Sequence, residues 1–153
     1  MPPVLRAARP GDYPEIIGLL QHADLPVDDL SAARFGWFIV VADAQGKLLA
    51  AGATEPFGSC GLVRSLAVSE PARGAGLGRA VLRNLEKRAL DRGISSLYLL
   101  TAGQSAFFEE HGYQRVTREA IPDEVRASRQ FSGICPASAT SLLKRLTLPM
   151  VKS

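Results

Sequence analysis

The stretch LAVSEPARGAGLG, residues 66–78, decides the fold of this chain. It joins an apolar run that is typical of a strand to a glycine-rich segment. Beyond the glycines, apolar side chains recur every fourth residue, at Leu77, Val81, Leu85 and Ala89. Because this spacing forms one stripe of a helix, a helix is predicted from Leu77 to about Asp91, with Gly93 ending it.

The glycine segment has the properties of a phosphate cradle. The first turn of a helix carries unpaired N–H groups and the positive end of the helix dipole. Glycines let the backbone approach an anion closely, and Arg73 and Arg79 add positive charge beside them. A dinucleotide fold requires GxGxxG, but counting from Gly74 places Arg79 at the third glycine. A P-loop requires Gly-Lys-Ser/Thr, which is absent, and a plain flexible turn before a helix stays open.

The order of the expected elements is that of one α+β domain over residues 1–153, a β-meander followed by β-α-β-α-β. Strands are expected at 4–8, 35–42, 47–55, 61–69, 96–100, 113–117 and 138–146. Helices are expected after an N-cap at Asp12, at 27–33, and at 77–91, 105–110 and 122–127. Alternation along 61–69 predicts one face with Leu62, Arg64, Leu66 and Val68, and the other with Val63, Ser65 and Ala67.

Composition narrows the functional class. The net charge of +3 and the pI of about 9.1 suit an anionic ligand. The sequence has no block of consecutive Lys or Arg, so no nucleic-acid partner is predicted. The sequence contains no CxxC motif and no Cys/His cluster, so no metal site is predicted. No signal-peptide pattern and no apolar run of about 18 residues occur, so neither export nor a membrane partner is expected. A cytoplasmic location with reduced thiols is the expectation.

Two motifs about 35 residues apart carry a family resemblance. Arg-x-x-Gly-x-Gly, after the strand ending Leu66-Ala67-Val68-Ser69-Glu70-Pro71, resembles motif A of the GNAT acetyltransferases. The stretch AFFEEHGY, residues 106–113, is similar to the second motif of that family on the coenzyme A side. The resemblance covers nearly the whole chain. It implies a GNAT fold, a mixed central sheet with a splayed strand pair and helices on both faces.

The resemblance also implies acetyl-CoA as co-substrate, with no metal. In this family the motif-A strand pairs with pantetheine through its backbone, and the glycine loop holds the pyrophosphate. Carried over by position, the cofactor-binding residues are Leu66, Ala67, Val68, Arg73, Gly74, Ala75, Gly76, Leu77, Gly78, Arg79 and Phe108.

Acetylation of an amine requires a base for the amine and a proton for the leaving thiolate. Glu55 is the candidate base, acting through a water, because it closes the strand beside the one expected to hold pantetheine; a solvated turn carboxylate stays open. Many GNAT enzymes carry a Tyr as general acid where this chain has Phe108. The thiolate is therefore expected to take its proton from water or another group. Tyr98 and Tyr113 are possible donors, but their positions in strands are more typical of packed side chains.

A narrower resemblance concerns the acceptor. LVRSLAV (62–68), Leu99-Leu100-Thr101 and Phe107-Phe108 look like the small GNAT proteins named for arsenic-resistance operons, as do Ile121-Pro122 and the stretch 131–139. They are also similar to the acetyltransferase domain of N-acetylglutamate synthases. Both imply an acidic amino acid, glutamate or a toxic analogue with an arsenic or phosphorus acid. The candidate substrate-binding residues are Arg64, Ser65 and Thr101.

Other interpretations stay open at this point. Arg64 could form a surface ion pair, and the acceptor could be a protein or peptide amine. The missing tyrosine leaves room for a non-catalytic acyl-CoA-binding regulatory domain. GNAT domains often pair through C-terminal strands, which favours a homodimer. Cys60 and Cys135 are expected to be small packing residues.

Overall fold

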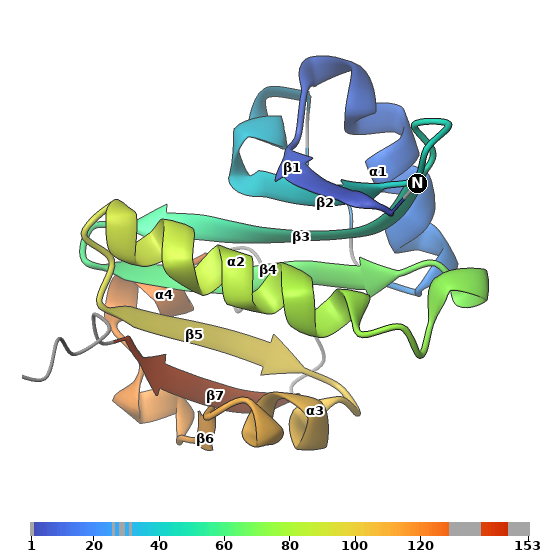
Figure 1. Cartoon of the computed structure of the whole chain (residues 1–153). Coiled ribbons are helices and arrows are strands. Elements are labelled where there is room, and N and C mark those ends of the chain that lie inside the picture. Colours follow the sequence, from blue (N-terminus) through green and yellow to red (C-terminus); the bar gives the residue numbers. More distant parts are fainter. Residues whose placement is uncertain (1, 26, 28–29, 31, 129–138, 147–153) are drawn as a thin grey trace, which may run out of the picture. The chain divides into compact units, whose positions relative to one another are not determined.

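The strands are hydrogen-bonded in the order β1-β2-β3-β4-β5-β7-β6 (Figure 1). The structure, a computed structural model, describes residues 2–25, 27, 30, 32–128 and 139–146. Two compact units share the chain: the first comprises Met1–Thr54 and Val63–Leu85, the second Glu55–Leu62 and Glu86–Ser153. Whether residues 1–153 act as one domain stays a prediction.

The first unit contains an antiparallel meander with helices around it. Its elements are β1 (Val4–Ala7), η1 (Pro10–Asp12), α1 (Tyr13–His22), η2 (Ala32–Trp37), β2 (Phe38–Ala42), most of β3 (Leu48–Phe57) and β4 (Cys60–Val68), η3 (Glu70–Ala72) and the start of α2 (Leu77–Asp91). The turn from β2 to β3 forms because Asp43 Oδ1 accepts from the N–H groups of Gln45 and Lys47, at 3.0 and 2.9 Å. The segment between the strands expected at 35–42 and 47–55 is thus a tight turn.

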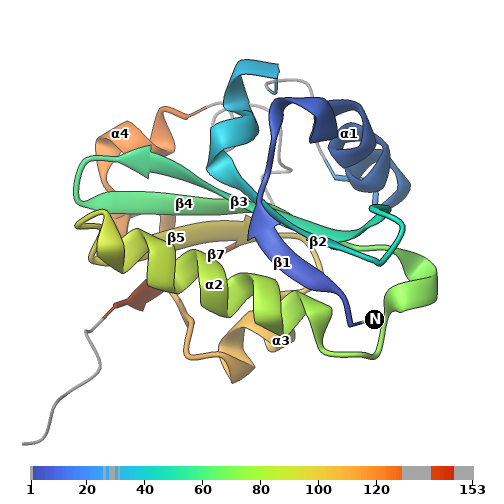
Figure 2. The same cartoon turned by 45° about the horizontal axis from the view of Figure 1, so that its top comes forward.

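Within the first unit, helices cover both faces of β3, with α1 and α2 on opposite sides in Figure 2. A Cβ at Gly52 would lie 2.7 Å from Val81 and 3.1 Å from Leu85, so glycine allows α2 to pack closely on this strand. The neighbouring positions of β3 belong to the core cluster that contains Ile16 and Leu20 of α1. Successive residues of β3 therefore face α2 and α1 in turn, so each face of the strand packs against one helix.

The second unit is built on β5 and β7. Its remaining elements are β5 (Ser96–Thr101), α3 (Ser105–Glu110), β6 (Gln114–Arg115), η4 (Arg118–Ala120), α4 (Asp123–Arg126) and β7 (Thr140–Arg145). β5 pairs antiparallel with β7 along its full length, and β6 pairs with β7. The parallel ladder between β4 and β5 joins three residue pairs, from Cys60–Ser96 to Leu62–Tyr98. Both strands continue beyond this short ladder.

Several sequence predictions differ from the structure. Residues 35–37 belong to the 3-10 helix η2 rather than to a strand, because pairing with the four-residue β1 begins only at Phe38–Ile39. Asp12 is the N-cap residue of α1, as predicted, but its side chain makes no capping bond to that helix; its carboxylate accepts from Arg6 and from the N–H of Arg9 instead. Strand β6 covers two residues of the predicted 113–117. Of the predicted helix at 27–33, residues 28, 29 and 31 lie outside the described residues, 27 and 30 are not helical, and 32–33 belong to η2. Ser138 also lies outside the described residues.

Candidate active site

The glycine loop lies in the first unit, between β4 and α2. Gly74 and Gly76 adopt left-handed φ angles of 90° and 80°, which side chains rarely adopt. A Cβ at either position would meet no atom within 4 Å, so conformation and not space requires glycine here. The first backbone bond of the helix runs from Ala80 N to Gly76 O, at 3.1 Å. The N–H groups of residues 77–79 thus belong to the first turn, where a helix offers no acceptor of its own.

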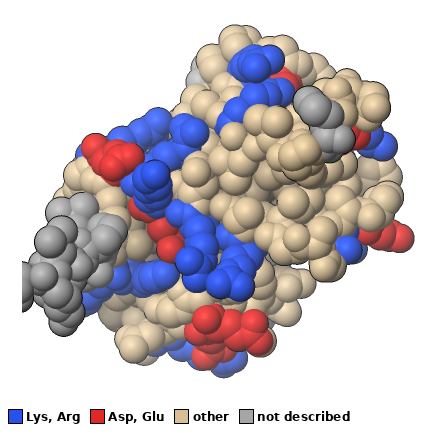
Figure 3. All heavy atoms as spheres, viewed as in Figure 1, with Lys and Arg blue, Asp and Glu red and all other residues tan. Residues whose placement is uncertain are grey.

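Positive charge surrounds this loop, and the loop is exposed. Arg73 and Arg79 are both exposed, and the first turn of α2, which is described throughout, holds no acidic residue. Figure 3 shows Lys and Arg side chains gathered over α2. Arg73 also braces the loop, because its Nε donates to the carbonyl of Val68 at 3.1 Å. Open backbone, a helix start and arginines fit the diphosphate of a coenzyme A molecule.

Strand β4 carries an irregularity that its sequence does not reveal. Ser65 has a φ angle of 58°, in the left-handed region, in the middle of the strand. A left-handed residue within a strand re-aims the peptide groups on both sides of it, as in a bulge. Arg64 and Ser65 are both buried, at 3% and 8% exposure. The strict alternation predicted for residues 61–69 is therefore wrong at Ser65.

Arg64 is a buried residue of β4. Its Nε donates to Ser65 Oγ at 3.3 Å. The surface ion pair that the sequence left open for Arg64 is excluded by this burial. Burying a guanidinium is costly unless anionic or hydrogen-bonding groups surround it. This pair of polar side chains lies on the same strand as the proposed pantetheine-binding residues Leu66–Val68.

Glu55 and Thr101, the other candidates for chemistry, belong to the second unit. Glu55 is half-buried and lies inside β3, which continues to Phe57, so it does not close the strand as predicted. Thr101 ends β5, and its Oγ1 accepts from the N–H of Gln104 at 3.2 Å. That bond gives Thr101 a role in the turn before α3. A role for Thr101 in binding substrate stays a prediction.

Phe108, at the position of the family's tyrosine, is buried at the centre of α3. Its ring packs edge-on against Tyr113, with centroids 5.7 Å apart. Burial, followed by the charge of Glu86 and a hydrogen bond to it, raises the pKa of Tyr113 far above its usual value. Because its hydroxyl already donates to Glu86 at 2.9 Å, Tyr113 is unsuited to protonate a leaving thiolate. Burial also raises the pKa of Tyr98.

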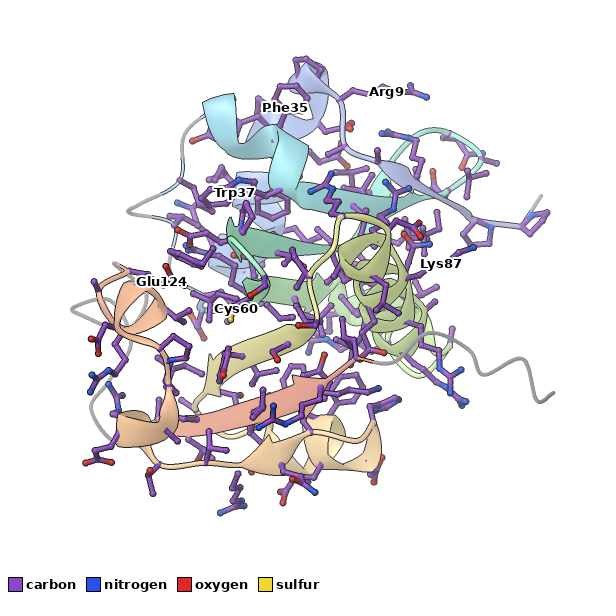
Figure 4. The ribbon with its side chains drawn as sticks, turned by 90° about the vertical axis from the view of Figure 1, so that its left-hand side faces the viewer. Arg9, Phe35, Trp37, Cys60, Lys87 and Glu124 are labelled. Carbon is purple, nitrogen blue, oxygen red and sulfur yellow. The ribbon has the colours of Figure 1, made fainter. Side chains whose placement is uncertain are left out.

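The cysteines and the search for metal ligands add little to the site. Cys60 is a free, half-buried cysteine at the start of β4 (Figure 4). Cys135 lies outside the described residues. Among the residues that the structure describes, no three His, Cys, Asp or Glu side chains gather as metal ligands. No helix in the described ranges is long and apolar enough to cross a membrane.

Sequence reasoning missed two polar features. The hydroxyl of Thr54 in β3 is buried and has no hydrogen-bond partner in the described part of the chain. Glu86 of α2 forms an internal cluster with Tyr113 and Lys144, at 2.9 and 3.0 Å. The sequence carries no signal for Thr54. A signal for the cluster existed in Glu86, an acidic residue amid the basic side chains of α2.

A model of the acetyltransferase (GNAT) family matches residues 7–113, more than half of the chain. The chain belongs to this family. The predicted family and GNAT fold are confirmed. The class of enzyme that this family comprises, N-acetyltransferases, is the predicted one.

Two relatives of this chain are amino-acid acetyltransferases. The amino-acid acetyltransferase of Neisseria meningitidis serogroup A is 26% identical over an alignment of 140 positions, which covers 84% of this chain and 31% of that protein. The amino-acid acetyltransferase of Mycobacterium tuberculosis is 28% identical over an alignment of 159 positions, which covers 98% of this chain and 87% of that protein. The chain thus spans about a third of the Neisseria relative and most of the mycobacterial one.

A crystal structure of N-acetylglutamate synthase from Neisseria gonorrhoeae, complexed with coenzyme A and N-acetyl-glutamate, is similar to this GNAT chain with a TM-score of 0.84. It is 24% identical, and the match covers 97% of this chain and 36% of that chain. At this identity the similarity shows the fold.

Proposed function

We propose that this chain transfers the acetyl group of acetyl-CoA to the α-amine of a small acidic amino acid. Glutamate and toxic glutamate analogues with an arsenic or phosphorus acid side chain are the proposed acceptors. The observation that carries the acceptor is buried Arg64, next to left-handed Ser65 on the motif-A strand. The names of the relatives, amino-acid acetyltransferases, support the same class.

The donor half of the proposal rests on the first unit. The N–H groups at the start of α2, with Arg73 and Arg79, would hold the pyrophosphate. The backbone of Leu66, Ala67 and Val68 would bind the amide-rich pantetheine arm as an added strand. Arg73 would keep the end of that strand and the loop together through its bond to Val68.

The acceptor half requires a cation for each acid group of the amino acid. A guanidinium binds a carboxylate, phosphinate or arsonate through two parallel hydrogen bonds. Arg64 would supply this contact, with the hydroxyl groups of Ser65 and Thr101 as further partners. Its burial strengthens such a charged contact, because screening by water is weaker there.

The reaction would proceed by direct transfer. The neutral amine attacks the thioester carbonyl, the carbon–sulfur bond breaks, and the amine proton passes through a water to Glu55. The thiolate takes its proton from water, because Phe108 has no acidic group and the Tyr113 hydroxyl is bonded to Glu86. Holding donor and acceptor together would supply much of the rate.

The test is a panel of amines with acetyl-CoA, followed by release of free thiol. L-glutamate and its phosphinic and arsonic analogues should be acetylated, and glutamine and peptide amines much more slowly. Faster turnover with peptides would contradict the proposed acceptor. Binding of acetyl-CoA without turnover of any amine would favour a regulatory acyl-CoA-binding domain.

Two variants separate the roles. Arg64→Ala should lower kcat/KM for the acidic acceptor at least about tenfold, since a hydrogen bond to a charged group contributes roughly 1.5–3 kcal/mol. Glu55→Gln should keep acetyl-CoA binding and lower kcat near neutral pH at least about a hundredfold, as loss of a general base does. Unchanged acceptor kinetics in either variant would remove that residue from the mechanism.

A further inference from the structure

Three side chains of the second unit form a closed polar cluster. Glu86 accepts from Tyr113 Oη through one carboxylate oxygen, at 2.9 Å, and from Lys144 Nζ through the other, at 3.0 Å. Lys144 Nζ also donates to the carbonyl of His111, at 2.8 Å. Each carboxylate oxygen of Glu86 thus ties one element to α2: the turn after α3 through Tyr113, and β7 through Lys144.

The cluster is largely shielded from water. The side chains of Glu86 and Lys144 are 14% and 27% exposed, and Tyr113 is 2% exposed as a residue. The Lys144 side chain passes over Gly112, where an added Cβ would lie 3.3 Å from its Cε. An ion pair in this setting is screened less than a surface pair. Losing one partner would leave the others buried with unsatisfied charge or hydrogen bonds.

The cluster acts on Phe108 through the backbone. The carbonyl of Phe108 accepts from the N–H groups of His111 and Tyr113, at 2.9 and 3.1 Å. Tyr113 is therefore joined to Phe108 by a backbone bond and by its edge-on ring contact, and its hydroxyl is fixed by Glu86. The end of α3 is thus held through Tyr113 by a backbone hydrogen bond, a ring contact and the hydroxyl bond to Glu86.

We infer that Glu86 is a positioning residue that fixes Phe108 for contact with bound acetyl-CoA by holding Tyr113 and Lys144. The inference rests on the proposed function and on Phe108 being one of the cofactor-binding residues that the family resemblance implies. Glu86 itself touches none of the reacting atoms. Its effect is transmitted by the turn at His111–Tyr113, which it holds to α2.

The kinetic consequence is specific. A loosened Phe108 weakens contact with the donor equally in the ground state and the transition state, which raises KM and leaves kcat unchanged. The acceptor's KM should not respond, because the cluster contains no residue assigned to acceptor binding. A merely structural role would instead lower the amount of folded enzyme, which reduces kcat and leaves both KM values unchanged.

The experiment compares Glu86→Gln with Glu109→Gln. Glu109 follows Phe108 directly and also pairs with a cation, Arg115, at 3.4 Å, but its side chain is exposed. Glu86→Gln should raise the KM for acetyl-CoA about tenfold with kcat within about twofold, a change in the range of single buried hydrogen bonds. Glu109→Gln should leave both constants unchanged.

A second readout is independent of turnover. Amide hydrogen exchange at His111 and Tyr113 should be faster in Glu86→Gln than in wild type and unchanged in Glu109→Gln. If Glu86→Gln does not fold, Tyr113→Phe removes the hydroxyl bond alone and should raise the same KM about threefold.

Wild-type KM for acetyl-CoA in a folded, active Glu86→Gln or Tyr113→Phe enzyme would overturn the inference, as would an equal rise in the acceptor's KM. Failure of the proposed function has a different signature, since wild-type protein would then release no thiol from acetyl-CoA.

Discussion

Ser65 is the residue at which this strand departs from regular geometry. Its φ angle is 58°. This backbone conformation costs glycine little free energy, costs ordinary residues about 1–2 kcal/mol, and costs β-branched residues more. The residue also accepts a hydrogen bond from Arg64. Backbone strain next to a buried arginine is consistent with a site that re-aims its peptide groups for a ligand.

Substitutions at Ser65 should therefore separate backbone from hydroxyl effects. Ser65→Val should unfold at lower denaturant than Ser65→Ala, with a free energy of unfolding lower by about 1–2 kcal/mol. Both variants lack the hydroxyl, so their difference reports conformation. Urea unfolding of the two proteins measures it, and equal midpoints would argue against a left-handed residue in β4.

The Arg6–Asp12 pair gives the first unit an acid-sensitive contact. The hydrogen bond from Arg6, at 2.7 Å, is the main cause that lowers the pKa of Asp12, and it outweighs burial. A carboxyl whose pKa is lower in the folded state stabilises it above the unfolded pKa, about 3.9, and loses this contribution as pH falls through the folded pKa. Asp12→Asn should thus destabilise the protein at neutral pH and cost much less near pH 2.

Urea unfolding of wild type and Asp12→Asn at both pH values checks this expectation. Asp91→Asn, at an exposed position at the end of α2, serves as control. A difference between wild type and Asp12→Asn that is as large in acid as at neutral pH would contradict the assignment.

Single residues show where sequence reasoning stops. Arg64 was expected on the strand that became β4, but its burial could not be foreseen from the sequence. Nor could the left-handed φ angle of Ser65, because serine carries no signal for positive φ. The clusters around Glu86 join residues up to 58 positions apart, and their pairing depends on tertiary packing.

The junction of β4 and α2 is the part of the fold that the local sequence pattern predicts best. Its period-four stripe predicted α2 with the bounds that the structure has, Leu77–Asp91. Local patterns suffice there, because the stripe is buried and Gly93 ends the helix with a φ angle of 82°. Residues 35–37 could not be assigned locally, since their state depends on where β1 begins to pair.

Gly76→Ala tests the loop directly. Added Cβ atoms meet no neighbour at this position, so the substitution should cost about 1 kcal/mol of stability through its φ angle of 80° alone. Because relaxation of the loop would move the N–H groups at the start of α2, the thermal shift caused by acetyl-CoA should shrink. Gly46→Ala, at a left-handed glycine (φ 84°) of the turn between β2 and β3 where an added Cβ also meets no atom, should retain a wild-type shift. An undiminished shift in Gly76→Ala would contradict the cradle.

On the scale of the whole molecule, the family match over residues 7–113 and the strand order support one common fold for the two motifs. The sequence predicted this architecture because the meander and the later β-α-β units follow local periodicity. The acceptor is less readable from local patterns, since the residues proposed to bind it, Arg64, Ser65 and Thr101, belong to different strands.

The proposed acetylation of acidic amino acids with acetyl-CoA is tested by steady-state release of free thiol from acetyl-CoA by the wild-type protein, with and without L-glutamate. Release should saturate with glutamate and fall close to background without an amine. Release that is independent of glutamate and its acidic analogues, from folded protein that binds acetyl-CoA, would contradict it.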